Sequence, residues 1–393
     1  MPENVVDSLQ SPTSSRRQVT LQSSHPKVAV VGTGMIARTH RRAALLAGAK
    51  IVGVLGSSAE RTAKFAADWR VGEYANMEEI AHSNADVVHI CTPNHLHAEY
   101  AAAALNAGKH VVLEKPVATS LGEAEELAAL AETTGLTVTV PFVYRYHPVI
   151  REIRARRLSG DLGDVHLVHG SYLQDWLLAA DASNWRVDPT LGGKSRAFAD
   201  IGSHWCDLAE WTSGRTFSSL VSSTSITVSA RPADSKESFA HTYDANIPKS
   251  SVETEDSAAV LMRDDDGAMA TTTVSQLAAG RKNRLWLEID GTKGSAAFDQ
   301  ENSERAWFGR AEGAEVFFRD SSTGSDDQRR LSMLPAGHAQ GYETCFELFL
   351  RDSYALMSGE AVEGVPTIHD GLRSARIVDA MLRSAAAHAW VSI

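Results

Sequence analysis

The chain has 393 residues, of which 43% are hydrophobic and 22% charged, and this composition is typical of a globular protein of two or three domains. It excludes a mainly disordered chain, a collagen and a coiled-coil rod. With 38 Lys and Arg against 49 Asp and Glu the net charge is −11, which disfavours general binding of nucleic acids or anionic membranes.

Residues 1–25 are rich in Ser, Gln and Pro and predict a flexible tail. Arg16-Arg17 is typical of an export signal, but such a signal needs a following apolar stretch of roughly 7–15 residues, and the residues here are polar. No apolar run approaches the ~18 residues of a membrane span. The three scattered cysteines fit reduced, buried thiols. We therefore expect a cytoplasmic protein.

A short apolar segment, 28–31, predicts a buried parallel strand, and a small-residue turn and a helix over 35–47 follow it. The turn reads Gly32-Thr33-Gly34-Met35-Ile36-Ala37. Gly32 permits a tight turn, Gly34 lets the backbone approach a pyrophosphate, and Ala37 lets the helix pack close to the strand. In this setting the pattern predicts a dinucleotide-binding unit rather than a plain strand–helix turn.

The second strand, 50–55, ends without the carboxylate that would hold a ribose 2′-hydroxyl. Ser57 and Ser58 offer small hydrogen-bond donors there, and Arg61 can pair with a 2′-phosphate. The sequence therefore favours NADP over NAD. The alternative is that Ser58 caps the next helix and that Arg61 is a solvated charge.

Strands over 86–91, 109–113 and 137–143 alternate with helices over 96–106 and 121–132, which predicts a doubly wound parallel sheet over residues 26–144. Ligands bind beyond the carboxyl ends of such strands. Thr92-Pro93-Asn94-His95-Leu96-His97 follows one strand and Glu114-Lys115-Pro116 the next. Lys115 is either a usable acid or base or a surface lysine. His95 and His97 lack a shared helical face and obvious partners, so we expect no metal.

The rest of the chain, 145–393, predicts an α+β domain with a large, mostly antiparallel open sheet. Its expected strands are 165–173, 219–228, 257–263, 268–276, 284–290 and 294–299, and its closing helices are 341–357 and 370–387.

Two groups of residues in this second part suggest a site. Asp200 and His204 share one face if their segment is helical, which gives a general acid/base pair or, alternatively, a helix cap and a core histidine. Aromatic and polar side chains that precede them suit a pyranose or cyclitol, unless the tryptophans are core residues. This second group comprises Tyr172, Gln174, Asp175, Trp176, Trp185 and Arg186.

Together these motifs resemble the glucose-fructose oxidoreductase / inositol dehydrogenase / rhizopine-catabolism (Gfo/Idh/MocA) family of NAD(P)-dependent oxidoreductases, from about Lys27 to about Ala387. The motifs that carry the resemblance, in chain order, are the glycine turn, Thr92–His97, Ala107-Gly108-Lys109-His110-Val111, Glu114-Lys115-Pro116, Tyr144-Arg145-Tyr146-His147-Pro148, Asp200-Ile201-Gly202-Ser203-His204 and Gly337-His338-x-x-Gly341-Tyr342.

The resemblance implies a role for each matching residue. Lys115 matches the catalytic lysine, and Asp200 and His204 match the pair beside the substrate. Thr92, Pro93, Asn94, His97 and Glu114 match positions near the nicotinamide and its ribose, and Tyr144 and Arg145 are expected at the substrate. The second domain of the family often mediates homodimers or homotetramers.

We therefore predict hydride transfer between NAD or NADP and a ring hydroxyl of a sugar, sugar derivative or cyclitol. His204 is the expected base near pH 7, and Lys115 the group that stabilises the developing alkoxide, although the sequence leaves open which takes the proton. Two alternatives are an NAD-dependent glycosidase and a redox-inactive regulator that senses dinucleotide or sugar. The presence of both Lys115 and His204 favours an enzyme.

Overall fold

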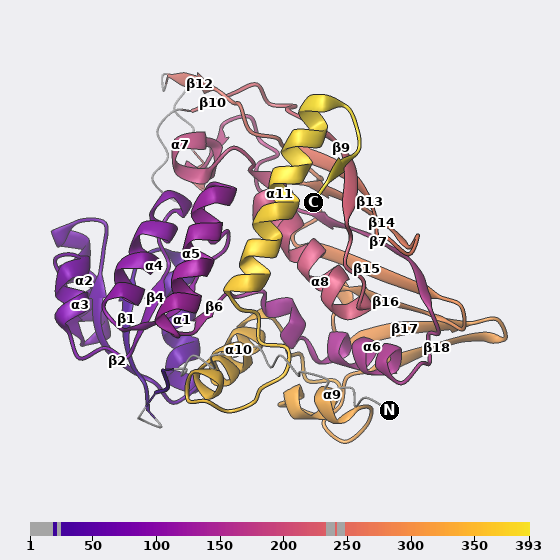
Figure 1. Cartoon of the computed structure of the whole chain (residues 1–393), viewed down its shortest axis with the longest axis horizontal. Helices are drawn as coiled ribbons and strands as arrows, with labels where there is room; N and C mark the ends of the chain where they lie inside the picture. Colours follow the sequence, from indigo (N-terminus) through magenta and orange to yellow (C-terminus); the bar gives the residue numbers. More distant parts are fainter. Residues whose placement is uncertain (1–18, 22–24, 233–239, 242–247) are drawn as a thin grey trace, which may run out of the picture.

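The computed structural model describes residues 19–21, 25–232, 240–241 and 248–393. The flexible tail predicted for residues 1–25 lies for the most part outside them. Of its described residues, Val19 donates its backbone N–H to the Gly135 carbonyl (3.1 Å) and Leu21 to the Met357 carbonyl (2.8 Å). The described residues form two large sheets that lie side by side, with helix α11 between the two halves, and two small two-stranded sheets, β10-β12 and β11-β8 (Figure 1).

The first sheet has the order β3-β2-β1-β4-β5-β6, and every pairing in it is parallel. Its central strands are apolar and fully buried, because helices cover both faces of such a sheet. The strands are β1 (Lys27–Val31), β2 (Lys50–Leu55), β3 (Gly72–Glu73), β4 (Val87–Ile90), β5 (His110–Leu113) and β6 (Val138–Thr139).

The helices of this half are α1 (Met35–Leu46), α2 (Ala59–Trp69), α3 (Met77–His82), α4 (His97–Asn106) and α5 (Leu121–Thr134). Each lies between two successive strands, which is the doubly wound arrangement predicted from the sequence. Local residues set the helix ends: Ser120 and Glu123 form a capping box at the start of α5, and Gly135 ends it in the left-handed conformation.

The second sheet has nine strands in the order β18-β17-β16-β15-β7-β14-β13-β9-β19, and only β7 and β14 pair in parallel among these neighbours. Side chains alternate between a buried and an open face, as in β13, where Ala258, Val260 and Met262 are buried. The strands are β7 (Val165–Leu173), β9 (Ser219–Ser225), β13 (Ser257–Arg263), β14 (Met269–Ser275), β15 (Arg284–Gly291), β16 (Ser295–Asp299), β17 (Arg305–Arg310), β18 (Gly313–Phe318) and β19 (Val391–Ser392).

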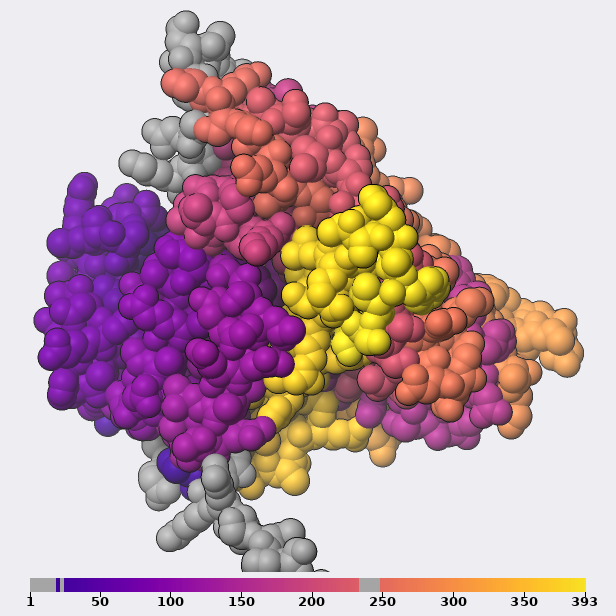
Figure 2. All heavy atoms as spheres, turned by 45° about the horizontal axis from the view of Figure 1, so that its top comes forward, coloured from indigo at the N-terminus to yellow at the C-terminus, as the bar shows by residue number. Residues whose placement is uncertain are grey.

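Helices α6 (Pro148–Leu158), α8 (Ser203–Ser213) and α11 (Ile368–Ala387) pack on the buried face of this sheet. Helix α10 (Tyr342–Met357) instead packs against α1 of the first half, and α11 contacts both α5 and β9 (Figures 1 and 2). The smaller elements are α7 (Pro189–Gly192), α9 (Asp326–Leu331), β8 (Ala182–Ser183), β10 (Ala230–Pro232), β11 (Ala240–His241) and β12 (Lys249–Ser251).

The predicted fold class is confirmed, with differences of detail. Strand β6 is only two residues long, because the chain turns after Thr139 and joins the segment before α11 through a bridge between Thr139 and Thr367. Strands β17 and β18, at one edge of the second sheet, were not predicted. Among the described residues no helix is both long and apolar enough to cross a bilayer.

Candidate active site

The glycine turn between β1 and α1 has the geometry of a pyrophosphate cradle. Gly32 has φ +116°, and a Cβ there would overlap the carbonyl oxygen of Cys91 at the end of β4. At Gly34 a Cβ would meet nothing within 4 Å, and no side chain caps the N-terminus of α1. The first N–H groups of α1 therefore face open space, which fits the phosphates of a dinucleotide.

At the tip of β2, Ser58 caps α2 and accepts a hydrogen bond from the Arg61 backbone N–H at 3.2 Å, as the alternative interpretation had it. The Arg61 side chain folds back onto the glycine turn, where its Nε donates to Thr33 Oγ1 (3.1 Å) and its Nη2 to the Thr33 carbonyl (3.2 Å). Ser57 is exposed. Arg61 is thus anchored beside the predicted phosphate site.

The tips of β4 and β5 are tied together by His97. Its Nδ1 lies 2.6 Å from the carbonyl of Pro116 and its Nε2 2.9 Å from that of Thr92, so both ring nitrogens are committed to the protein. His97 therefore braces the loop that carries Lys115. Asn94, also predicted at the cofactor, donates its Nδ2 to the Gly192 carbonyl at 2.8 Å, across to the second half.

Lys115 meets Asp200 where the two halves face one another. The Lys115 Nζ donates to the Asp200 carbonyl (2.7 Å) and to its Oδ1 (2.8 Å), while Arg186 Nε lies 3.5 Å from Oδ1. Gln276 Nε2 donates to Oδ2 at 3.0 Å. Burial alone would raise the pKa of Asp200, but the cations Lys115 and Arg186 hold it well below its usual range, so the carboxylate is ionised.

His204 lies one turn beyond Asp200, at the start of α8, and is only 7% exposed. Its ring packs edge-on against Phe142 (5.7 Å between centroids) and Tyr144 (5.2 Å). Burial, and then the charge of Lys115, lower its pKa well below the usual value, with Asp200 opposing. Its buried Nδ1 has no hydrogen-bond partner among the described residues. A neutral imidazole with a free nitrogen therefore stands beside the Lys115–Asp200 pair.

A hydrogen-bonded cluster of tyrosines and amides adjoins His204. The Tyr144 and Tyr172 hydroxyls lie 2.6 Å apart, Asn283 accepts from Tyr172 (2.7 Å) and Gln174 (2.8 Å), and its Nδ2 donates to the Tyr144 hydroxyl (3.1 Å). Trp176 Nε1 donates to Gln174 Oε1 at 2.8 Å. Burial raises the pKa of Tyr144 to about 12, so its hydroxyl stays protonated. The cluster places aromatic faces and polar groups beside the candidate acid/base residues.

Two residues predicted at the substrate are engaged elsewhere. Arg145 is buried and pairs with Asp207 and with Asp370 (2.6 Å), and it lines a surface cavity of about 410 Å³ formed by residues of α6, α8 and α11. Asp175 accepts from Lys282 Nζ (2.6 Å) and from the Gly280 backbone (3.0 Å). The Arg186 guanidinium lies over the Trp185 ring, with its Cζ 4.3 Å from the ring centroid. Trp185 thus supports the arginine that faces Asp200.

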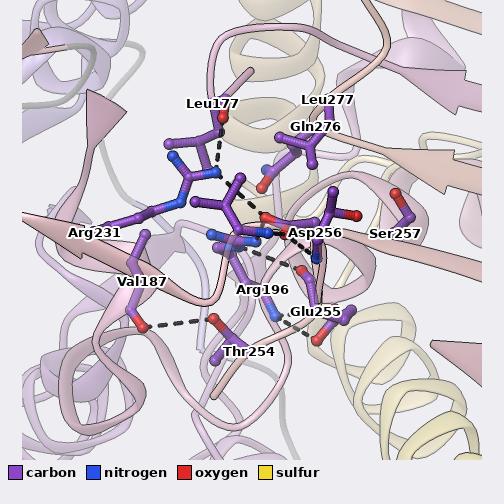
Figure 3. Close-up of polar contacts among 12 residues, drawn as sticks. Leu177, Val187, Arg196, Arg231, Thr254, Glu255, Asp256, Ser257, Gln276 and Leu277 are labelled. Carbon is purple, nitrogen blue, oxygen red and sulfur yellow. Dashed lines mark hydrogen bonds and ion pairs between the residues drawn. The ribbon is translucent and has the colours of Figure 1, made fainter. Parts of the chain in front are cut away.

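The helical segment that carries Asp200 is fixed by a buried polar cluster (Figure 3). Glu255 accepts hydrogen bonds from the backbone N–H groups of Arg196 and Phe198, where the segment begins. The Arg196 guanidinium pairs with the fully buried Asp256, and the Asp256 carbonyl accepts from the backbone N–H of Gln276 at 3.0 Å. One cluster therefore positions both Asp200 and the glutamine that holds it.

Arg231 extends this cluster to the loop that leads toward Trp185. It donates to the carbonyls of Leu177 (2.7 Å), Ala179 (2.9 Å) and Ala182 (2.9 Å) and lies 3.5 Å from Asp256 Oδ1 (Figure 3). Gln276, Asn283 and the whole cluster were not predicted from the sequence, because their partners are remote in the chain and no local spacing marks them.

The described residues contain one group of ligand-type side chains close enough to share a metal ion: His169, Glu288 and Asp290, on β7 and β15. His169 belongs to the same strand as Tyr172 but lies on the open face of the sheet, as do the two carboxylates. It is not among the residues around Lys115.

Comparison with known proteins identifies the class. A family model described as the oxidoreductase family with an NAD-binding Rossmann fold matches residues 26–142, and the Gfo/Idh/MocA C-terminal domain matches residues 150–297. The chain belongs to this family of NAD-binding oxidoreductases, as the motifs predicted.

Individual relatives agree with this assignment. Levoglucosan dehydrogenase of Pseudarthrobacter phenanthrenivorans is 31% identical over 316 residues, which are 78% of this chain and 80% of the relative. A solved levoglucosan dehydrogenase in complex with NADH and L-sorbose has a TM-score of 0.85 at 26% identity and covers 94% of this chain and 99% of its own. An oxidoreductase domain protein from Kribbella flavida has a TM-score of 0.84 at 29% identity, with coverage of 94% and 100%.

Proposed function

We propose that this chain is a dehydrogenase that transfers a hydride between a nicotinamide dinucleotide and a ring hydroxyl of a sugar, sugar derivative or cyclitol. The observation that carries the proposal is the meeting of Lys115, Asp200 and His204 at the carboxyl edge of a dinucleotide-binding sheet. Ligands of doubly wound sheets bind at this edge. A reacting carbon held there lies between the two halves of the protein.

The nicotinamide ring supplies the hydride chemistry when the cofactor is bound. The free N–H groups at the start of α1 hold the phosphates, and the loops after β4 and β5 line the nicotinamide side. Lys115 places an ammonium where the substrate oxygen gains negative charge, and Asp200 orients that ammonium. The same carboxylate accepts from Gln276, which fixes its second oxygen.

The sequence left open whether Lys115 or His204 takes the hydroxyl proton. His204 Nδ1 is buried and has no hydrogen-bond partner among the described residues, and the lowered pKa keeps the ring neutral at neutral pH. We propose that His204 accepts the hydrogen bond of the substrate hydroxyl and that Lys115 stabilises the alkoxide as the proton leaves. The sequence predicted that the limb of the pH–rate profile that reports His204 lies near neutrality. Because the pKa of His204 is lowered, we propose that this limb lies at acidic pH, below the ordinary pKa of a histidine.

The substrate class rests on the side chains around His204. The Tyr144, Tyr172, Gln174 and Asn283 cluster offers aromatic C–H contacts together with donors and acceptors, which suits a polyhydroxylated ring. Levoglucosan dehydrogenase and a glucose-6-phosphate 3-dehydrogenase of Bacillus subtilis, 27% identical over 183 residues, are among the relatives. Both names support a sugar-type substrate.

Three finer expectations remain part of this proposal. NADP is preferred to NAD, on the strength of Arg61 beside the glycine turn and the lack of a carboxylate at the tip of β2. The protein forms a homodimer or homotetramer, for which the open face of the second sheet, with Leu261, Met269 and Trp307 exposed, is the surface that fits. It acts in the cytoplasm.

The decisive experiment is a panel of sugars, sugar derivatives and cyclitols offered with NAD and with NADP, with formation of the reduced cofactor followed by its absorbance. Accumulation of reduced cofactor with a member of the panel supports a dehydrogenase. Release of an aglycone without net reduction would instead identify a glycosidase, and binding without turnover a regulator.

A further inference from the structure

A chain of four buried titratable side chains leads away from the candidate active site. Glu114 Oε1 lies 3.0 Å from His40 Nε2, His40 Nδ1 lies 3.2 Å from His89 Nδ1, and His89 Nε2 lies 3.0 Å from the Tyr354 hydroxyl. The second oxygen of Glu114 accepts from the backbone N–H of Lys115 at 3.2 Å. The chain thus begins beside the candidate catalytic lysine.

The four residues come from four elements that the fold brings together: the end of β5, α1, β4 and α10. His40 and His89 are fully buried, Tyr354 is 5% exposed and Glu114 is 8% exposed. Phe346 of α10 packs on the His40 ring with centroids 5.1 Å apart, so the imidazole has little freedom to turn. A buried polar chain is costly unless every member is satisfied, and here each ring nitrogen has one partner.

The direction of the hydrogen bonds follows from the donors available. Burial and the charge of His40 lower the pKa of His89, so His89 is neutral and carries one ring proton. If the Tyr354 hydroxyl donates to His89 Nε2, the single ring proton of His89 is on its Nδ1 and points to His40 Nδ1. His40 then carries its own proton on Nε2 and donates it to Glu114.

This bond keeps Glu114 ionised. Burial alone would raise its pKa, but the hydrogen bond and charge of His40, with Lys115 and His97, hold the pKa of Glu114 below its usual range. In the strand order β2-β1-β4-β5 the glycine turn follows β1, and Arg61 marks the β2 side. A dinucleotide whose phosphates lie at the glycine turn, at the carboxyl edge of this sheet, therefore places its nicotinamide half over β4 and β5, beside Glu114.

We propose that His40, His89 and Tyr354 are positioning residues that hold Glu114 as an oriented carboxylate and thereby favour the oxidised over the reduced nicotinamide. The oxidised ring carries a positive charge that the reduced ring lacks, so a fixed carboxylate nearby distinguishes the two forms. This inference rests on the proposed function, because it needs a nicotinamide at this edge.

The test compares two substitutions of His40, the residue that contacts Glu114, whose new side chains have similar lengths. His40→Met removes the donor, and His40→Gln keeps an amide donor where Nε2 stood. Calorimetric titration with NAD⁺ and NADH, and in parallel with NADP⁺ and NADPH, should show that His40→Met weakens the oxidised form roughly 5- to 50-fold more than the reduced form. His40→Gln should keep the wild-type ratio within about threefold, at a similar melting temperature.

Equal weakening of both forms, or the same shift in both variants, would overturn the proposal, because a merely structural histidine gives that result. Tyr354→Phe, which leaves the packing almost unchanged, should shift the ratio in the same direction by a smaller factor, and it serves if His40→Met does not fold. In the cofactor-free protein, ¹⁵N NMR of the imidazoles should find His40 protonated on Nε2. A neutral His40 protonated on Nδ1 would refute the chain itself, whereas a wild-type protein that binds no nicotinamide dinucleotide would refute the proposed function.

Discussion

The two halves of the molecule build their parts of the site in different ways. In the first half the backbone makes the site: a glycine turn, the N-terminus of α1 and two strand tips, all within short stretches of sequence. In the second half side chains make it: Asp200 is held by Lys115, 85 positions away, and by Gln276, 76 positions away. Single side-chain substitutions should therefore disturb the part of the site in the second half more than the backbone-built part in the first half.

Lys115 joins the halves, and its loss should have the largest effect. Lys115→Met should lower kcat by about 10²–10⁴ while the affinity for the dinucleotide changes little, because the ammonium acts on the substrate oxygen and not on the phosphates. Steady-state kinetics and calorimetry on the same preparation measure both quantities. Lys109→Met is the matched control, since Lys109 stands at the opposite end of β5 and its Nζ bonds the Ser83 carbonyl. Wild-type kcat in Lys115→Met would remove the lysine from the reaction.

His204→Ala tests the second half alone. It should lower kcat/KM by about 10² and leave dinucleotide affinity nearly unchanged. Because the pKa of His204 is lowered, the wild-type rate should hold as pH falls through 6.5, the ordinary value, and drop only at more acidic pH as the ring is protonated. The variant should lack that acid limb. A His204→Ala variant with a lower melting temperature but a wild-type kcat/KM would show that His204 is only a packing residue.

Arg61→Ala probes a side chain at the dinucleotide site of the first half, where it is expected to decide between two cofactors. It should weaken NADP binding more than NAD binding by about 1–3 kcal/mol, the contribution of a charged hydrogen bond. Binding of both cofactors to this variant and to Lys64→Ala, a control on the same helix, is compared by calorimetry. Equal losses for both cofactors would mean that Arg61 acts only by bracing Thr33.

Gln276→Met should give the smallest effect, because it removes one hydrogen bond to Asp200 and leaves the Lys115–Asp200 pair in place. A loss of about 1 kcal/mol, or about fivefold in kcat/KM, is expected, with dinucleotide affinity unchanged. Kinetics with the identified substrate measures it. No change in kcat/KM would show that the position of Asp200 is set by Lys115 and the backbone without help from Gln276.

What the sequence predicted follows the same division. The glycine turn and the strand tips were found because their residues are neighbours in the chain, and local spacing reports such sites well. The four-residue spacing of Asp200 and His204 suggested a shared helical face, and the resemblance to the family supplied their predicted role. Gln276, Asn283 and Tyr354 were not found, because only the fold brings them to their partners. The ion pairs of Arg145 with Asp207 and Asp370 were not predicted for the related reason that these carboxylates lie far along the chain.

Helix α11 is fastened at both ends to different halves. At its start, Thr367 bridges to Thr139 of the first sheet and Val140 donates its N–H to the Pro366 carbonyl; near its end, Ser384 Oγ accepts from the Ser222 backbone of the second sheet at 2.9 Å. A rigid rod fixed in this way resists any change in the separation of the two bodies. The radius of gyration measured by small-angle scattering should therefore stay the same whether the protein is empty or saturated with ligand, and any separation of the two halves would have to begin with fraying of α11.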